Sequence, residues 1–188
     1  MEKIKHFDWL APLYEKFVSK KASQKLLQSL TLMENQLILD IGGGTGRIAQ
    51  GLIGDGRKVV VADLSFQMLL EAKHKSDLCC VTCNALVLPF EDHLFDRIVM
   101  VDTLHHLFEQ EISLRELWRV LKPSGFIVIE EPDISRFTVK IIALIEKVLL
   151  MKSKFLKSQE LINLLELVNP VEISEYKEND TYWIVVTK

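Results

Sequence analysis

The chain has 188 residues, of which 48 % are hydrophobic and 26 % are charged, and its formal net charge is −3. These values are ordinary for one globular domain and exclude a disordered chain, a collagen and a disulfide-stapled miniprotein. Proteins that hold nucleic acid through its phosphates usually carry an excess of basic residues, so the acidic balance disfavours a nucleic-acid partner.

Short apolar runs alternate with stretches of helical periodicity along most of the chain. The predicted strands are Leu37–Ile41, Lys58–Ala62, Leu78–Cys83, Arg97–Val101 and Phe126–Glu130. The predicted helices are Arg47–Ile53, Ser65–Lys73, Glu111–Leu121, Ser135–Met151 and Ser158–Val168. This alternation predicts a parallel sheet whose buried strands are covered by helices on both sides.

The C-terminal end has a different pattern. Two further strands are predicted at Val171–Tyr176 and Thr181–Val186, and Asn179-Asp180 between them is a turn signal. A connection this short joins antiparallel strands. The sheet is therefore expected to be parallel except for one reversed strand.

No stretch of the sequence is predicted to span a membrane. The longest apolar run, Ile141–Leu150, is interrupted by Glu146 and Lys147 and is far shorter than the roughly 20 residues that cross a bilayer. The N-terminal residues carry charges within their apolar stretch, unlike a secretory signal. We therefore expect a soluble, cytoplasmic protein without stable membrane insertion.

The three cysteines, Cys79, Cys80 and Cys83, fall in the predicted third strand. Side chains alternate between the two faces of a strand, so Cys80 points away from the other two and three ligands cannot converge on one metal. We expect buried, reduced cysteines and no metal site.

A buried strand that ends in a carboxylate and runs into a glycine-rich turn is the strongest functional signal. The stretch Leu37–Gly46 reads LILDIGGGTG. Glycines permit positive φ and let a ligand approach the backbone closely. Ligands of open α/β sheets bind outside the carboxyl ends of the strands, so this pattern predicts a nucleotide-like ligand at the turn.

The acid in this stretch distinguishes two kinds of nucleotide. Residues 44–49 fit the dinucleotide pattern G-x-G-x-x-A, but the Asp40 carboxylate would repel a pyrophosphate. It suits a ligand with an ammonium group and no phosphate, such as S-adenosylmethionine. Asp63 ends the next strand, where a carboxylate binds ribose hydroxyls in either kind of site, although it could instead be a favourable acid at a helix start. Ser65 is the expected N-cap of that helix.

Further motifs follow in a fixed order. LILDIGGGTGRIA is followed by VVVADLS, then NA, LPF and FDRIV around the predicted fourth strand, then LHH and LWRVLKPSG. This series resembles class I S-adenosylmethionine-dependent methyltransferases, and within them the small-molecule subgroup that includes ubiquinone/menaquinone biosynthesis C-methyltransferases. The resemblance covers most of the chain. It implies S-adenosyl-L-methionine as cofactor, S-adenosyl-L-homocysteine as product, and in-line transfer of a methyl group to a small-molecule acceptor.

The resemblance also implies a three-layer αβα, Rossmann-like α/β fold. Its seven strands would follow the order 3-2-1-4-5-7-6, with strand 7 antiparallel, which agrees with the predicted hairpin. Residues 1–188 would form a single methyltransferase domain. Within it, residues 1–30 would form an N-terminal lid or helix, and residues 133–157 a helical insert that caps the substrate.

The family's cofactor site can be carried over residue by residue. Asp40 would anchor the methionine end beside Gly42 and Gly44, and Asp63 would bind the ribose. The remaining residues implied to bind the cofactor are Leu64 and Met68 beside the adenine, Asn84 and Ala85 at its amino group, and Val101 and Asp102 below the sulfonium. Asn84 departs from the aspartate that is commoner in the family, so we expect weaker adenine recognition.

Candidates for catalysis and acceptor binding lie near the same edge. His105 and His106 are the candidate bases, or else a structural turn. Glu130 and Glu131 would contact the substrate or form a solvated strand end. Tyr14 would reach the cofactor or substrate from the lid, or belong to a helix packed on the core.

Alternatives remain at this level. The lysine-flanked segment Phe137–Leu156 is an amphipathic cap, or it admits a hydrophobic substrate or touches a membrane surface. The protein could be a catalytically inactive methyltransferase-fold protein that binds cofactor. An NAD-dependent oxidoreductase rests on the glycine pattern alone. The sequence names neither the acceptor nor the atom that is methylated, and it leaves the oligomeric state open.

Overall fold

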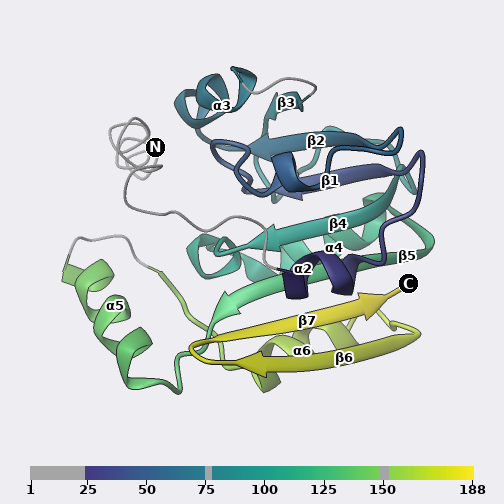
Figure 1. Cartoon of the computed structure of the whole chain (residues 1–188). Helices are drawn as coiled ribbons and strands as arrows, with labels where there is room; N and C mark the ends of the chain where they lie inside the picture. The colour runs from purple at the N-terminus through teal and green to yellow at the C-terminus, as the bar shows by residue number, and fades with distance from the viewer. Residues whose placement is uncertain (1–23, 75–77, 149–152) are drawn as a thin grey trace.

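The computed structural model describes residues 24–74, 78–148 and 153–188. Its centre is a seven-stranded sheet with the order β3-β2-β1-β4-β5-β7-β6 (Figure 1). Strand β7 is antiparallel to both of its neighbours, β5 and β6. The other pairs, β3-β2, β2-β1, β1-β4 and β4-β5, are parallel. The expected strand order and reversed strand are both confirmed.

The elements have the following bounds. The strands are β1 (Leu37–Ile41), β2 (Lys58–Asp63), β3 (Leu78–Thr82), β4 (Phe95–Val101), β5 (Leu121–Pro132), β6 (Glu172–Glu178) and β7 (Thr181–Thr187). The α-helices are α2 (Gln24–Leu30), α3 (Phe66–Lys73), α4 (Gln110–Val120), α5 (Phe137–Val148) and α6 (Ser158–Glu166). Two short 3₁₀ turns are η1 (Ala49–Gly51) and η2 (Leu104–His106).

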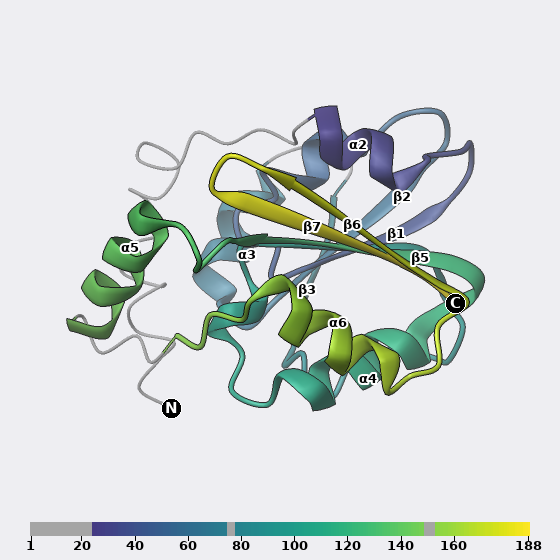
Figure 2. The same ribbon diagram turned by 90° about the horizontal axis from the view of Figure 1, so that it is seen from below.

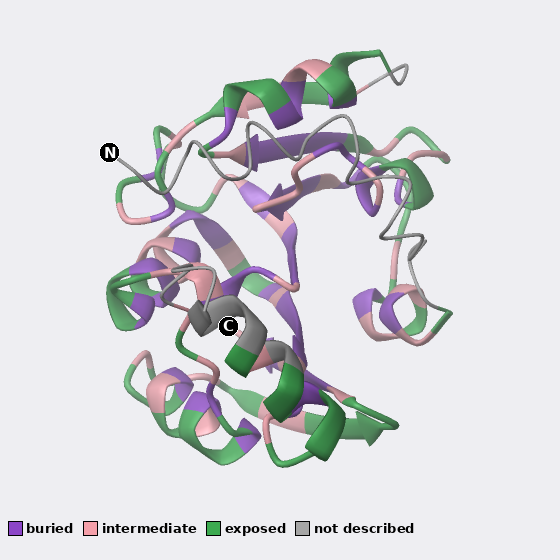
Figure 3. Cartoon of the chain, turned by 90° about the vertical axis from the view of Figure 1, so that its left-hand side faces the viewer, coloured by how far each residue is buried: buried purple, intermediate pink, exposed green. Residues whose placement is uncertain are grey.

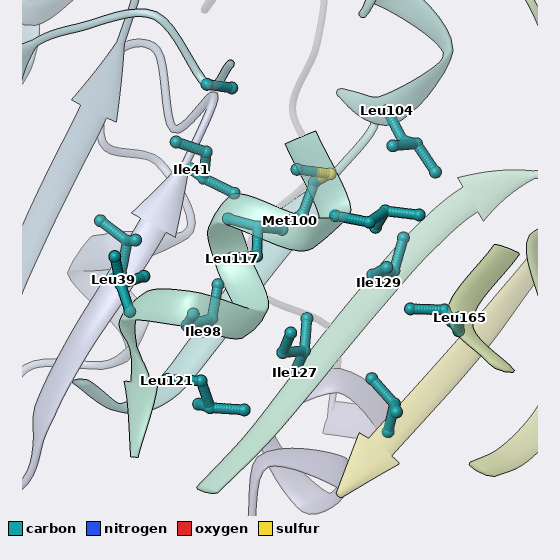
Figure 4. Close-up of a cluster of buried hydrophobic side chains, with 14 of the residues drawn as sticks. Leu39, Ile41, Ile98, Met100, Leu104, Leu117, Leu121, Ile127, Ile129 and Leu165 are labelled. Atoms are coloured by element: carbon teal, nitrogen blue, oxygen red, sulfur yellow. The ribbon is translucent and has the colours of Figure 1, made fainter. Parts of the chain in front are cut away.

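Helices cover both faces of the sheet, as alternating strands and helices predict. In Figure 2 α2 lies on one side of the sheet, and α4 and α6 lie on the other. The strands supply each face with alternate side chains. Ile98 and Met100 belong to the cluster under α4 and α6 (Figure 4), whereas Val99 and Val101 belong to the cluster under α2. Two apolar layers therefore fix the sheet between helices.

The predicted helix Arg47–Ile53 is wrong. Only the 3₁₀ turn η1 forms there, and the chain then returns to β2 through a tight turn closed by a bridge between Gly54 and Arg57. Gly54 and Gly56 have positive φ, which ends helical geometry within a few residues of the glycine-rich turn.

The expectation of buried cysteines is also wrong. Strand β3 lies at the edge of the sheet, so neither of its faces is fully covered. Cys79 is exposed, and Cys80 and Cys83 are half-buried free thiols. An apolar run of this length does not distinguish an edge strand from a central one.

The carboxyl ends of the parallel strands meet at one edge, which faces the viewer in Figure 3. The connections that follow β1, β2, β4 and β5 leave the sheet there. Helix α5 stands at this edge, and much of its described surface is exposed. No helix among the described residues has the length and apolar character that crossing a bilayer requires.

Candidate functional site

A cavity opens at the carboxyl ends of β1, β2 and β4. The residues that line it include all ten that the sequence assigns to the cofactor, namely Asp40, Gly42, Gly44, Asp63, Leu64, Met68, Asn84, Ala85, Val101 and Asp102. They come from four segments that are distant in sequence. The fold therefore brings the predicted residues together around one space.

Asp40 lies at the base of this cavity, on β1. Its side chain is fully buried, and its Oδ2 atom has no hydrogen-bond partner among the described residues. Burial raises the pKa of Asp40 to about 7, against a hydrogen bond from the amide of Ala49 that lowers it. A buried carboxylate oxygen without a donor is suited to a cationic ligand group.

The glycine turn passes close over this carboxylate. A Cβ added at Gly43 would lie 2.7 Å from both Cγ and Oδ2 of Asp40, so only glycine fits there. At Gly44, where φ is +52°, the nearest atom to an added Cβ would be Oδ2 of Asp63 at 3.9 Å. The space beside Gly44 is thus open to a ligand, whereas the space beside Gly43 is filled by the protein.

The amides of this turn are already engaged inside the protein. The amides of Gly42 and Gly43 donate to the carbonyl of Ala62 at 2.7 and 3.4 Å, and the amide of Gly44 donates to Oδ2 of Asp63 at 2.9 Å. A pyrophosphate needs such amides as donors. These three amides are therefore not available to a phosphate, and the buried acid beside the turn would repel one.

Asp63 has two roles in this geometry. Its Oδ1 atom accepts the amide of Ser65 at 2.8 Å, next to the start of α3, while Oδ2 supports the glycine turn. Ser65 is the N-cap of α3 and accepts the amide of Met68 at 3.2 Å, as expected. The carboxylate is half-buried at the cavity wall, where it can accept ribose hydroxyls in addition.

The side of the cavity to which the sequence assigns the adenine is lined by Leu64, Met68, Asn84 and Ala85. Met68 and Ala85 are buried, whereas the Leu64 side chain is half exposed. Asn84 accepts the amide of Leu86 through Oδ1 at 3.0 Å, so its amide oxygen already has one donor. The second lone pair of that oxygen remains as an acceptor for an exocyclic amine.

Thr103 is a site residue that the sequence analysis missed. It follows Asp102, whose φ is +49°. The single hydroxyl proton of Thr103 lies within donor reach of the carbonyl of Val101, at 2.9 Å from Oγ1, and of that of Gly42, at 3.3 Å. Thr103 therefore joins the turn after β4 to the turn after β1. Other lining residues were also not assigned to the site, among them Thr45, Arg47, Cys83 and Leu107. Thr45 and Arg47 lie within the glycine-rich motif and Cys83 lies next to Asn84, so their positions could have indicated them.

The two histidines have different surroundings. His106 lines the cavity, and its Nδ1 lies 3.1 Å from Oγ of Ser153. His105 is buried, and its Nδ1 lies 2.6 Å from Oε2 of Glu131. Only His106 therefore borders the space in which a cofactor and acceptor would meet.

Glu130 and Glu131 are both buried, so the alternative of a solvated strand end is wrong. Consecutive residues of β5 point to opposite faces of the sheet. Glu130 accepts the indole N–H of Trp183 at 2.9 Å, and Glu131 accepts the amides of Thr103 and Leu104 at the start of η2. Neither residue lines the cavity.

The predicted lid is only partly described. Tyr14 lies outside the described residues, and of segment 1–30 only α2 is described. Leu26 and Leu30 pack this helix on the sheet, and Nε of Arg97 donates to the carbonyl of Leu30 at 2.9 Å.

Comparisons with known proteins also indicate a methyltransferase. Residues 39–129 match the family model described as a methyltransferase domain. A relative from Coxiella burnetii named ubiquinone/menaquinone biosynthesis C-methyltransferase UbiE is 36 % identical over 110 residues, which are 53 % of this chain and 44 % of that protein. The match thus spans less than half of that relative's length.

Two solved structures share the fold. An S-adenosylmethionine-dependent methyltransferase from Thermotoga maritima aligns over 100 % of both chains, with a TM-score of 0.82 and 23 % identity. The [4+2]-cyclase SpnF aligns over 97 % of this chain and 93 % of its own, with a TM-score of 0.76 and 13 % identity. The match over residues 39–129 identifies this part of the chain as a methyltransferase domain, and its motifs and sheet order are those of the class I S-adenosylmethionine-dependent methyltransferases.

Proposed function

We propose that this chain transfers the methyl group of S-adenosylmethionine to a small, largely apolar acceptor. The observation that carries the proposal is the buried Asp40 carboxylate, whose Oδ2 has no donor among the described residues and whose pKa is about 7. An ammonium group bound in the cavity beside this carboxylate would stabilise its negative charge. The methionine end of S-adenosylmethionine carries such a group.

The same geometry disfavours a dinucleotide. The amides of Gly42, Gly43 and Gly44 all donate within the protein, and Asp40 lies directly beneath them. A pyrophosphate at this turn would meet a carboxylate instead of donors. An oxidoreductase therefore has little support beyond the glycine pattern.

Different residues around the cavity would bind different parts of the cofactor. Asp40 would hold the methionine end, Asp63 the ribose, and the buried Met68 and Ala85 would pack against the adenine. The cofactor brings an activated methyl group on a sulfonium. The protein then has to align the acceptor and exclude water, and it needs a base only if the acceptor must lose a proton.

His106 is the residue best placed to interact with the acceptor. It borders the cavity beyond Val101 and Asp102, and its ring can orient an acceptor hydroxyl or take its proton near neutral pH. His106→Ala should therefore reduce turnover more than it reduces cofactor affinity. Unchanged turnover with an accepted substrate would remove His106 from the reaction.

An apolar acceptor is favoured by the rim of the site. Large apolar side chains are exposed on the connections that follow β2, β3, β4 and β5. They are Leu64, Phe66, Val87, Phe108, Phe137, Ile141 and Leu144. Phe137, Ile141 and Leu144 follow i, i+4, i+7 spacing, so they share one face of α5. Residues 136–157 also hold six basic residues and one acid, in a chain whose net charge is −3.

Two measurements test the proposal. Calorimetry should show binding of S-adenosylhomocysteine and none of NADH; the opposite pattern would overturn the proposed cofactor. Incubation with S-adenosylmethionine and a panel of phenols and hydroquinones, with and without apolar tails, should release S-adenosylhomocysteine. Binding without release from any acceptor in the panel would favour the alternative of a cofactor-binding protein that has lost catalysis. The fold alone does not require methyl transfer, because the [4+2]-cyclase SpnF shares it.

The α5 face can be tested separately. Replacing Phe137 and Leu144 together by Ser should raise the KM of tailed acceptors and leave that of untailed ones unchanged. Exchange of the exposed Met33, which lies away from this edge, for Ser is the matched control. Co-sedimentation of the wild type with anionic vesicles that the α5 variant abolishes would instead assign this face to a lipid surface.

A further inference from the structure

Glu131, at the end of β5, is a buried carboxylate that gathers donors from one short turn. Its Oε1 accepts the amides of Thr103 at 2.9 Å and Leu104 at 2.7 Å, and its Oε2 lies 2.6 Å from Nδ1 of His105. Residues 103–105 are 26 to 28 positions away in sequence. A single side chain thus fixes both the backbone and the first histidine of η2.

This contact determines the state of the His105 ring. A carboxylate only accepts hydrogen bonds, so Nδ1 of His105 carries the proton and donates it to Glu131. The ring is also held by stacking. It lies 4.3 Å from the Phe155 ring, at an interplanar angle of 12°, and 4.0 Å from the His106 ring, at 50°. His105 is therefore a buried connector between Glu131 and His106.

His106 connects Glu131, His105 and η2 to the cavity, which its side chain lines. Its amide donates to the carbonyl of Thr103 at 3.0 Å, so the turn that Glu131 caps also fixes the His106 backbone. Its side chain contacts the His105 ring on one side and Oγ of Ser153 on another. The position of the His106 ring therefore depends on Glu131 through two routes, the η2 backbone and the His105 ring.

The segment that follows α5 is attached to the same turn. The amide of Lys154 donates to the carbonyl of His105 at 2.7 Å, and Nε2 of Gln110 donates to the carbonyls of Leu104 and Lys154 at 3.0 and 2.8 Å. The helical insert thus returns to the core on η2, beside the cavity. A displacement of η2 would move the insert and the His106 ring together.

We propose that Glu131 and His105 form a positioning pair that holds His106 against the acceptor side of the cofactor cavity. The pair touches neither cofactor nor acceptor, because neither residue lines the cavity. Its effect on turnover rests on the proposed methyl transfer. Its effect on the His106 ring does not, so the two ideas can fail separately.

The first experiment follows the imidazole nitrogens of uniformly ¹⁵N-labelled protein by NMR between pH 5 and 9, with and without S-adenosylhomocysteine. Glu131→Gln should remove the Nδ1–H signal of His105 and change the nitrogen shifts and titration midpoint of His106. Unchanged His106 signals in a folded Glu131→Gln protein would overturn the proposal. The ligand-free spectra decide this point even if the wild type fails to bind S-adenosylhomocysteine.

The second experiment measures steady-state kinetics with whichever acceptor the panel identifies. Glu131→Gln should lower kcat about tenfold or more, as loss of a partner behind an active group commonly does, with the KM for S-adenosylmethionine within about threefold. Glu116→Gln is the matched control, because Glu116 also accepts a backbone amide, that of Leu88, and pairs with Arg119 away from the cavity. Equal losses in both variants would assign the effect to general destabilisation.

His105→Gln keeps the proposal testable if Glu131→Gln does not fold. Its side-chain amide can still donate to Glu131 but cannot reproduce the ring stacking. It should change the His106 signals and lower kcat in the same direction. Where both variants fold, the double variant should lose no more than the worse single one, because the two side chains act as a unit. Additive losses would contradict a positioning pair.

Discussion

The Oδ2 atom of Asp63 accepts the amide of Gly44 at 2.9 Å, so the end of β2 supports the glycine turn that follows β1. The other oxygen of the same carboxylate accepts the amide of Ser65 at 2.8 Å. Two connections of the sheet thus share one side chain, and the ribose that we assign to Asp63 would bind a carboxylate that is already oriented.

Asp63→Ala should therefore weaken the protein even without ligand. Losing one acceptor for two amides should cost about 1–3 kcal/mol of unfolding free energy, measured by urea denaturation. Affinity for S-adenosylhomocysteine should fall as well. Asp63→Asn keeps one acceptor oxygen. Its unfolding free energy and its affinity for S-adenosylhomocysteine should lie between those of the wild type and the alanine variant. A fully stable alanine variant would show that the Gly44 contact contributes nothing.

Cofactor affinity should depend on the protonation of Asp40. Its pKa is raised by burial to about 7, so below that pH the ligand's ammonium group must displace a proton from the carboxyl group. The dissociation constant of S-adenosylhomocysteine should rise toward about tenfold per pH unit below pH 7, and be nearly constant from pH 7.5 to 8.5. Calorimetry across pH 5.5–8.5 measures this. Asp40→Asn should bind at least about tenfold more weakly at pH 8 and lose the pH dependence.

Asp40 should also make the ligand-free protein less stable as the pH rises. The pKa of this acid is higher in the folded state, about 7, than its ordinary value of 3.8, so folding favours the protonated form. The destabilisation is nearly absent below pH 4, grows between pH 4 and 7, and is complete above pH 7. At about 1.4 kcal/mol per pH unit it reaches on the order of 4 kcal/mol.

Asp40→Asn should remove this penalty. Its gain in unfolding free energy over the wild type should be larger at pH 8 than at pH 4.5, measured without ligand. An equal difference at the two pH values would mean that the buried carboxyl group does not titrate in this range.

Replacing Gly43 or Gly44 by alanine should impair the protein for different reasons. Gly43→Ala places a Cβ 2.7 Å from Asp40 and 2.8 Å from Cγ1 of Val61, so it should lower the unfolding free energy by roughly 1–3 kcal/mol or more. Gly44→Ala meets open space and bears only the cost of its left-handed φ, about 1–2 kcal/mol. Its main effect should be loss of cofactor affinity. Thermal denaturation and calorimetry on both variants separate the two effects.

The thiols should report cofactor binding. Cys83 lines the cavity, and burial raises its pKa to about 11, so it should react slowly with iodoacetamide at pH 8. The exposed Cys79 should be modified first. S-adenosylhomocysteine should protect Cys83 and leave the rate at Cys79 unchanged, as mass spectrometry of timed samples can show. Protection of both thiols would indicate a change beyond the cavity.

Many of the residues that line the cavity were predictable from sequence because they lie in short motifs at strand ends. Asp40 and Gly44 are four residues apart, and a single strand-to-turn connection places both. Helical periodicity gave a wrong prediction at a segment whose structure depends on the turns that follow it. Residues 47–53 have helical periodicity, but the glycines at 54 and 56 and the short return to β2 leave only a 3₁₀ turn.

The sequence by itself determined the strand alternation, the reversed last strand and the chemistry of the glycine turn, since these follow from hydrophobic period, connection length and residue type. Only the tertiary structure decided that β3 is an edge strand, that Glu131 is a buried partner of His105, and that His106 alone of the two histidines borders the cavity. Burial and hydrogen bonding between residues far apart in the chain depend on which segments pack together, and no local pattern carries that information.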